Sequence, residues 1–525
     1  MRRALLVLVV SALVGSGAPL GTAVAADSAG KDFWLAFPPA FAEGSPAFEL
    51  LINGSTAASG TASVPGTTFS QGFTVSPGAT TTVSLPEAVE QGAGDTVTSG
   101  DAIHVVADHD IAVHARYANP QTGDGFLGLP TELLGTSYRV LDYPGNPLCG
   151  KGEFDVVGTQ AGTTVTIESP VAIGGHPAGT PYDVTLNAGS TYLGQAAGTG
   201  STSGTEITAD KPIAVIAGNS CAQVPVGTPY TNFLVEQMPP ISAWGMSFAL
   251  LPFAARSSGD QVTVLGSADR ITLSVTGEGG PVGGAPATLN AGQSATFSID
   301  EPVRIAADKP ILVAHFAQGM ETESGEPDKT GDPTMILVPP REHWAHAQTV
   351  STPASGFPQR YLNVAIGTGD LASLRLDGAP VAAASFAPIA GDSATSGARL
   401  AIAAGPHSLT ADGPIGVEVY GFAPGDAFGW AGAWGDGSRA PLPPTPPPLA
   451  LTGPPPFPPA KCRVPKLKGK KLAAVKRVLK RNRCRLGGVK KLKGATAKNG
   501  RVVKQKPAAG KSRPAGAKVA VVLDD

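Results

Sequence analysis

Three histidines and two aspartates gather in the stretch HVVADHDIAVH, which covers residues 104–114. Imidazole and carboxylate groups bind metals only where several of them converge on one point. Alternation along a strand would place His104 and Asp108 on one face and His109 on the other. We therefore expect edge residues in solvent rather than a metal site for His104, His109, His114, Asp108 and Asp110.

Two other stretches carry groups that bind metals. His343 and His346 form an His-x-x-His pair after two prolines, but no carboxylate follows at a set distance. The segment ETESGEPDKTGDP carries five carboxylates: Glu321, Glu323, Glu326, Asp328 and Asp332. Oxygen-rich loops bind Ca²⁺, although this spacing does not follow an EF-hand. We expect a solvated acidic loop, with Ca²⁺ as the alternative, and no other metal or cofactor.

The patterns that mark a catalytic nucleophile are missing from the sequence. GNSCAQ and ASGF do not supply the Gly-x-Ser-x-Gly turn. No glycine-rich phosphate-binding fingerprint is present, and GGPVGG follows no helix. Cys221 is expected to be oxidised, which removes it as a thiolate. We predict no catalytic residue and no cofactor-binding residue, so the protein is not expected to be an enzyme.

The four cysteines are Cys149, Cys221, Cys462 and Cys484. An even number of cysteines in an exported chain favours disulfides, and no histidine lies near either pair at zinc-ligand spacing. Four cysteines allow three connectivities. Two cysteines lie in each half of the charge division described below, and this favours the pairs Cys149–Cys221 and Cys462–Cys484.

A motif of seven residues occurs four times and indicates the architecture: ADHDIAV, ADKPIAV, ADKPILV and ADGPIGV. Its aspartates are Asp108, Asp210, Asp308 and Asp412, which lie 102, 98 and 104 residues apart. Asp followed by Pro is typical of a turn, and the apolar run after it is typical of a buried strand. The period matches one β-sandwich, of about 100 residues. A propeller blade has about 40–50 residues, which makes a four-bladed propeller the less favoured solution.

The chain begins with MRR, an apolar run and AVAA, which together predict a secretory signal peptide. The apolar run is shorter than the roughly 20 residues of a membrane helix, and no later segment is longer. We expect a secreted protein, extracellular or associated with a cell wall, without a transmembrane segment.

Charge and proline divide the mature chain into two parts. Residues 461–525 carry 22 Lys and Arg against 2 acidic residues, whereas residues 27–460 carry 15 basic and 39 acidic residues. Between them lies APLPPTPPPLALTGPPPFPPA, an extended spacer. We predict these divisions: a signal peptide at 1–26, β-modules at 27–145, 146–248, 249–345 and 346–438, a Pro-rich linker at 439–460, and a small domain at 461–525.

The body resembles the N-terminal domain of the IgG Fc-binding protein family. The stretches that carry the resemblance are GKDFWLAFP, FLGLPTELLGTSYRVLDY, GNSCAQVP, VEQMPPISAWGMSF, PFAARSSGDQVTVLGS and GDPTMILVPP, from about residue 30 to 345. The fourth repeat, 346–438, shares only the weak motif. The resemblance implies a secreted adhesive protein that binds an unknown protein or glycan.

The tail resembles a PASTA domain in VPKLKGKKLAAVKRVL, CRLGGVKKL and GRVVKQKPAAGKSRPAGAKVAVVL. Leu472, Val475, Val478 and Leu479 would share one helical face. The resemblance implies binding to peptidoglycan stem peptides. The many Lys and Arg residues depart from the family pattern and favour anionic wall polymers. Nucleic acid is not expected as a partner, because the tail lacks interleaved aromatic residues and is exported.

These observations predict an all-β body of tandem β-sandwich-like modules and a small α+β (βαββ) PASTA-like domain. The predicted function is non-enzymatic binding or adhesion at the surface of a bacterium, held at the cell wall by residues 461–525. Residue usage rich in Ala, Gly, Pro and Arg is typical of an actinobacterium. The alternatives are a glycan hydrolase on a β-sandwich, which needs two carboxylates in one cleft, and a purely structural wall spacer.

Overall fold

The computed structural model describes residues 28–435, except 42–43, 93, 121, 147–148, 257 and 321–329. It also describes 461–524, except 482–483, 493, 497–498 and 515–516. The chain forms two compact units, Met1–Arg439 and Ala440–Asp525. The predicted signal peptide lies outside the described residues, as do 436–460, which include the predicted linker.

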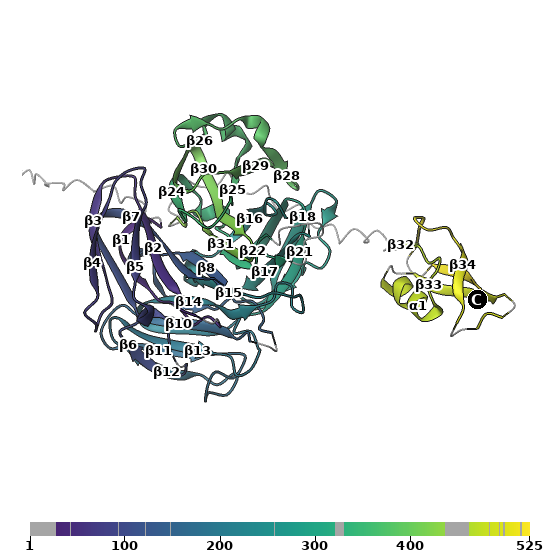
Figure 1. Ribbon diagram of the computed structural model, residues 1–525, viewed down its shortest axis with the longest axis horizontal. Coiled ribbons are helices and arrows are strands. Elements are labelled where there is room, and N and C mark those ends of the chain that lie inside the picture. The colour runs from purple at the N-terminus through teal and green to yellow at the C-terminus, as the bar shows by residue number, and fades with distance from the viewer. Residues whose placement is uncertain are drawn as a thin grey trace, which may run out of the picture. The chain divides into compact units, whose positions relative to one another are not determined.

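The first unit is all-β, as predicted, and each of its four large sheets is built around one long strand (Figure 1). These are β7 (Ile103–Asn119), β14 (Glu206–Ala222), β22 (Val303–Ala317) and β30 (Gly405–Ala423). The C-terminal half of each is dense in buried apolar residues. This burial accounts for the β-branched runs that follow each motif.

The remaining strands of each sheet flank its long strand. The first sheet contains β1 (Gly30–Leu35), β2 (Ala47–Asn53), β3 (Ala58–Ser63), β4 (Ser70–Val75), β5 (Thr81–Leu85) and β8 (Thr122–Leu127). The second contains β6 (Val97–Ser99), β9 (Gly135–Arg139), β10 (Gly152–Gly158), β11 (Thr163–Glu168), β12 (Tyr182–Leu186), β13 (Ser190–Gln195) and β15 (Asn232–Gln237). The third contains β16 (Gly245–Leu250), β17 (Asp260–Gly266), β18 (Ile271–Gly277), β19 (Gly280–Pro281), β20 (Thr288–Leu289), β21 (Ser294–Ile299) and β23 (Thr334–Leu337).

The fourth sheet contains β24 (Ala345–Thr352), β25 (Gln359–Gly367), β26 (Arg375–Leu376), β27 (Ala379–Pro380), β28 (Ala387–Ile389), β29 (Asp392–Ala401) and β31 (Asp426–Ala431). Short 3₁₀ helices connect the strands: η1 (Glu87–Val89), η2 (Thr131–Leu133), η3 (Ile241–Ala243), η5 (Arg341–His343), η6 (Thr368–Ser373) and η7 (Ala383–Ser385).

The repeated motif lies inside the long strands, and the predicted turn at each motif is wrong. Along β1 and β7 the pairing passes from Asp32–Val106 to Gly30–Ile111, so residues 107–110 bulge out of the ladder. The same shift occurs in β14, β22 and β30. Proline fits a bulge because its missing N–H is not needed by the ladder. Residues that favour turns therefore serve here to shift a strand between partners.

The bulge aspartates have a structural role. Asp108 Oδ1 accepts the backbone N–H of Ser59 at 2.8 Å, and Asp210 Oδ1 accepts that of Thr164 at 2.9 Å. Asp308 Oδ1 accepts the N–H of Thr272 at 2.7 Å. Each bond ties the bulge to the neighbouring strand, which supports leaving these aspartates out of a functional site.

The four sheets close into a ring. The strand that follows each long strand contacts its counterpart in the next sheet, in the order β8, β15, β23, β31 and back to β8. Figure 1 shows β8, β15 and β31 close together where the sheets meet. A hydrophobic core runs through all four sheets and includes Leu51, Val156, Leu312 and Val417. The body is therefore made of β-sandwich-like modules, as predicted, and the four modules share one core.

Hydrogen bonds from side chains, rather than β-ladders, join the neighbouring strands β8, β15 and β23 of the ring. Thr334 Oγ1 donates to Asp124 Oδ1 at 2.6 Å, and Leu337 N donates to Glu236 Oε1 at 3.0 Å. Asn232 Nδ2 donates to the carbonyls of Gly123 and Pro333, both at 2.7 Å. Burial raises the pKa of Asp124 and Glu236 well above the usual range.

Strand pairing does not follow two of the predicted module boundaries. β9 pairs with β14 and so belongs to the second sheet, although it lies before the expected boundary at 145/146. β16 pairs with β22 and crosses the expected boundary at 248/249. The division into modules otherwise stays a prediction.

The second unit is a small α+β domain, as predicted. Its elements are β32 (Lys461–Arg463), α1 (Leu472–Arg481), β33 (Arg485–Lys491), β34 (Arg501–Lys506), β35 (Ser512–Pro514) and β36 (Lys518–Asp524). β36 lies between β33 and β34, and β32 pairs with β35. Val475 and Leu479 are buried in the core, and Leu472 and Val478 pack against it, which confirms the predicted helix face. Among the described residues, no helix is long and apolar enough to cross a membrane.

Candidate functional site

The histidines of β7 do not converge. His104 stacks on Trp34 with ring centroids 3.9 Å apart, and its Nε2 lies 3.2 Å from Asp32 Oδ2. The exposed His109 pairs with its neighbour Asp108 at 3.0 Å. His114 is buried, and burial lowers its pKa to about 4. Within the described ranges, no three His, Cys, Asp or Glu side chains form a metal-ligand group.

The second pair of histidines and the acidic loop are also separate. His343 is buried and contacts the carbonyl of Gly435 through Nδ1, whereas His346 is half-buried on β24. Of the candidate Ca²⁺ loop, Glu321, Glu323, Glu326 and Asp328 lie outside the described residues. Asp332 is buried, and burial raises its pKa well above the usual range.

The Cys149–Cys221 disulfide is present, with its Cα atoms 5.7 Å apart. It ties the segment after β9 to the end of β14, beside Asn146, whose Oδ1 accepts the N–H of Cys149 at 3.2 Å. The predicted Cys462–Cys484 bond depends on the Cys462 side chain, which lies outside the described side chains. That bond stays a prediction.

A buried ionic network joins the third and fourth sheets, and the sequence analysis missed it. His315, on β22, lies between two carboxylates: its Nδ1 is 2.9 Å from Glu418 Oε1, and its Nε2 is 3.0 Å from Asp260 Oδ2. Burial alone would lower the pKa of His315, but the charges of and hydrogen bonds to Glu418 and Asp260 raise it to about 9. The imidazole is therefore charged at neutral pH.

Further contacts hold this network, although the buried Asp260 Oδ1 has no hydrogen-bond partner in the described part of the chain. Phe253 stacks on the His315 ring at 4.0 Å, and its N–H donates to Asp260 at 2.7 Å. Asn363 Nδ2 donates to Glu418 Oε2 at 2.9 Å, and Tyr420 Oη donates to Asn363 Oδ1 at 2.7 Å. A charged residue inside an apolar strand, such as Glu418 in IGVEVYGF, is the sequence signal that points to it. The burial of His315 indicates a structural clamp rather than a ligand site.

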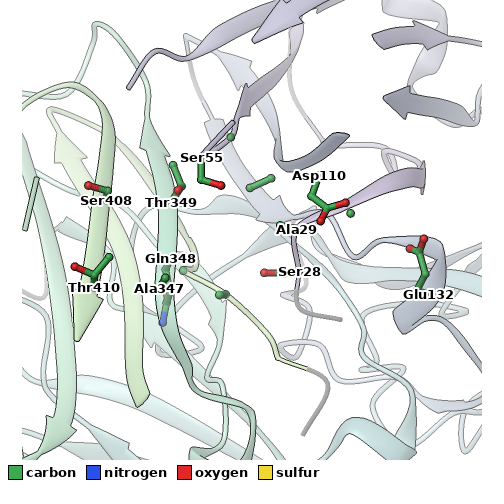
Figure 2. A pocket seen from close by; sticks show the side chains of 15 residues that line it. Ser28, Ala29, Ser55, Asp110, Glu132, Ala347, Gln348, Thr349, Ser408 and Thr410 are labelled. Carbon is green, nitrogen blue, oxygen red and sulfur yellow. The ribbon is translucent and has the colours of Figure 1, made fainter. Parts of the chain in front are cut away.

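A pocket of about 430 Å³ lies between the first and fourth sheets. Figure 2 shows Asp110 and Glu132 on one side and Thr349, Ser408 and Thr410 on the other. The bulge of β7 carries Asp110, η2 carries Glu132, and β24 carries Gln348. Sequence reasoning considered Asp110 only as a metal ligand, and it did not consider Glu132 or Gln348.

The lining of this pocket accepts hydrogen bonds. Asp110 and Glu132 are exposed carboxylates, and Ser55, Thr349 and Thr410 add hydroxyls. The described lining holds no Lys, Arg or His side chain. Glycines and alanines make up most of the rest of the wall, so a ligand could approach the backbone closely. The chemistry that this arrangement supports is recognition of a polar ligand.

The ring of β-sheets, the polar pocket and the basic α+β domain define a class: a multidomain protein with an all-β body. Residues 124–421, more than half of the chain, match the family model described as IgGFc binding protein. The chain therefore belongs to this family. The match reaches into the fourth sheet, beyond residue 345, where the predicted resemblance ended, and it leaves residues 30–123 outside. The PASTA domain model matches residues 463–525, as predicted.

Two further comparisons define the extent of these similarities. The human (Homo sapiens) IgGFc-binding protein is 32% identical over 277 residues, which are 51% of this chain and 5% of the human protein. The chain thus corresponds to a small part of that relative. A solved structure titled "tetra-tandem repeat in extending region of large adhesion protein" covers 73% of this chain and 92% of its own. Its identity of 12% and TM-score of 0.09 carry no argument.

Proposed function

We propose that this chain is a secreted binding protein that its C-terminal domain holds at the bacterial cell wall. The ring of sheets would bind a protein or glycan ligand. The observation that carries the proposal is the combination in one chain of an IgGFc binding protein region with a PASTA domain. A non-enzymatic role is supported by the human relative, which is named as a binding protein.

The surface of the basic domain supports retention by charge. Every described Lys and Arg side chain between 464 and 524 is exposed, while Val475, Val502 and Val521 lie in a separate core. A dense positive surface attracts anionic polymers, and salt screens that attraction over a Debye length of about 10 Å at 0.1 M. Teichoic-type phosphates and peptidoglycan carboxylates both supply the opposite charge.

Retention on purified wall sacculi tests the proposal. The full mature chain and a chain that ends at residue 438 are incubated with sacculi in about 50 mM and about 500 mM NaCl, which differ in screening. We expect the full chain to be retained at low salt and released at high salt, and the truncated chain to stay in solution. Equal retention of the two chains would show that the basic domain is not the anchor.

The same experiment separates charge from stem-peptide recognition. Sacculi stripped of phosphate polymers retain peptidoglycan but lose most anionic groups. Loss of retention on stripped sacculi supports charge-based adhesion, whereas unchanged, salt-resistant retention supports recognition of the peptidoglycan itself.

A further inference from the structure

The pocket between the first and fourth sheets lies where the fourfold repeat is broken. The strands β1, β9 and β16 each carry an aromatic residue at the same register position, three residues before the motif aspartate of the long strand that they pair with. These residues are Phe33, Tyr138 and Phe248. All three rings are fully buried. Gln348 occupies this position in the fourth sheet, opposite Leu409. A smaller polar side chain thus replaces an aromatic ring where the pocket opens.

Gln348 keeps only part of the role of the residue that it replaces. Tyr138 Oη donates to the carbonyl of Ile213 at 2.7 Å, and Gln348 Nε2 donates to the equivalent carbonyl of Ile415. The Gln348 side chain is 6% exposed, and its Oε1 has no partner in the described part of the chain. A buried acceptor without a donor is costly, so a donor from a ligand would be favourable here.

The glycine beside this oxygen preserves the opening. A Cβ at Gly432 would lie 2.6 Å from Gln348 Oε1, and Gly432 itself lines the pocket. Any larger residue at 432 would displace the amide. The unpartnered oxygen therefore lies against the pocket wall.

The opposite wall departs from the repeat as well. Pro212, Pro310 and Pro414 precede the isoleucine that follows the bulge in three modules, and Asp110 takes that place in the first. The substitution adds a carboxylate where the repeat has none. Figure 2 shows Asp110 and Glu132 across the pocket from Thr349, Ser408 and Thr410.

We infer that this pocket binds the ammonium or guanidinium group of a lysine or arginine side chain on a partner polypeptide. Two carboxylates and an unpartnered amide oxygen favour a ligand that donates hydrogen bonds, and charge-assisted donors bind carboxylates most strongly. The acidic body steers cations toward it. The inference rests on the proposed binding function and gives it a location and a chemistry.

A saccharide fits these observations less well. Sugars present acceptors as well as donors, and their apolar ring faces pack on aromatic rings, which the described lining lacks. The volume of the pocket is within the range of sites for small groups. One basic side chain with its neighbouring backbone is the occupant that the lining favours.

Calorimetric titration of the full mature chain with tripeptides tests the inference. The probes are acetyl-Gly-Arg-Gly-amide, its lysine counterpart, and its citrulline counterpart, which keeps the shape of arginine without the charge. We expect the arginine and lysine probes to bind about tenfold more tightly than citrulline, as the loss of one charge-assisted contact implies. Equal binding of citrulline, or binding of chitotriose without binding of either cationic probe, would overturn the inference.

Variants that restore the repeat locate the site. Asp110→Pro and Gln348→Phe introduce residues that sister modules carry at the same positions, so both variants should fold. Each variant is expected to bind the arginine probe about tenfold more weakly than the parent chain. Glu132→Gln is a third variant for the case in which one does not fold. Glu168→Gln removes an exposed charge from β11, outside the pocket, and should leave binding unchanged. If all variants bind like the parent, the pocket is not the site.

The outcome is independent of the broader proposal. A chain that remains on sacculi but binds no cationic probe would refute the pocket and leave the binding role intact. A chain that binds the probes but is not retained would refute wall anchoring alone.

Discussion

His315 shows how one side chain can stabilise the contact between two sheets. Its imidazole belongs to β22, and one of its carboxylate partners, Glu418, belongs to β30. Removing one member of a buried ionic group leaves the others uncompensated, which costs about 3–5 kcal/mol. The clamp therefore acts at the joint where the third sheet meets the fourth.

This clamp predicts a pH dependence of stability. The folded-state pKa of His315 is about 9, above its ordinary value of 6.5, because Glu418 and Asp260 favour the charged form against burial. Its contribution is fully present below about pH 6.5 and is lost as the pH rises through 9. Chemical denaturation at several pH values from 6 to about 10 should show this loss.

His315→Gln is the matched control for the pH series. Glutamine keeps hydrogen-bonding capacity but cannot take a charge, so the variant should be less stable at pH 6 and should lose less stability as the pH rises. If parent and variant lose stability in parallel across this range, His315 is not the group responsible.

At the scale of the element, the motif bulges explain what the sequence could and could not predict. Asp and Pro at a fixed period indicated a backbone irregularity before a buried strand, and the irregularity is there. The prediction of a turn failed because the pattern does not reveal whether the chain reverses or continues. The bulge lets one strand pair with two sets of partners, and this pairing is a long-range property.

Asp210→Ala tests the bulge as a structural device. The change removes the acceptor for the Thr164 N–H, so the free energy of unfolding should fall by about 1 kcal/mol. Asp412→Ala is the control from the same motif, because Asp412 contributes a backbone N–H to Ser373 Oγ instead, at 3.0 Å. Equal losses in the two variants, measured by denaturant titration, would contradict the assigned role.

At the scale of the whole molecule, ring closure was not predictable from the repeat alone. Four copies of a β-module are compatible with a row or with a ring, and the choice depends on contacts such as β8 with β31. The pocket follows from closure, since Asp110 and Gln348 lie far apart in sequence and meet only where the first module contacts the fourth. Comparison of the four repeats could have singled out both residues, because each departs from its sisters.

A ring with a shared core should not tolerate loss of one module. A chain that ends at residue 338 would expose apolar surface of the other three sheets, so we expect it to lose cooperative thermal unfolding. A chain that ends at 438 loses only the separate second unit and should keep the melting temperature of the body. Native-like melting of the shorter chain would mean that the modules are independent.

The central claim is that a binding body is exported and held at the wall through its basic domain. The most direct measurement is fractionation of a Gram-positive host that expresses the chain with its own N-terminus, as the full sequence or ending at residue 438. The account predicts that the full chain is found in the wall fraction and is released by high salt, while the shorter chain is found in the medium. Full-length protein in the medium or inside the cells would contradict it.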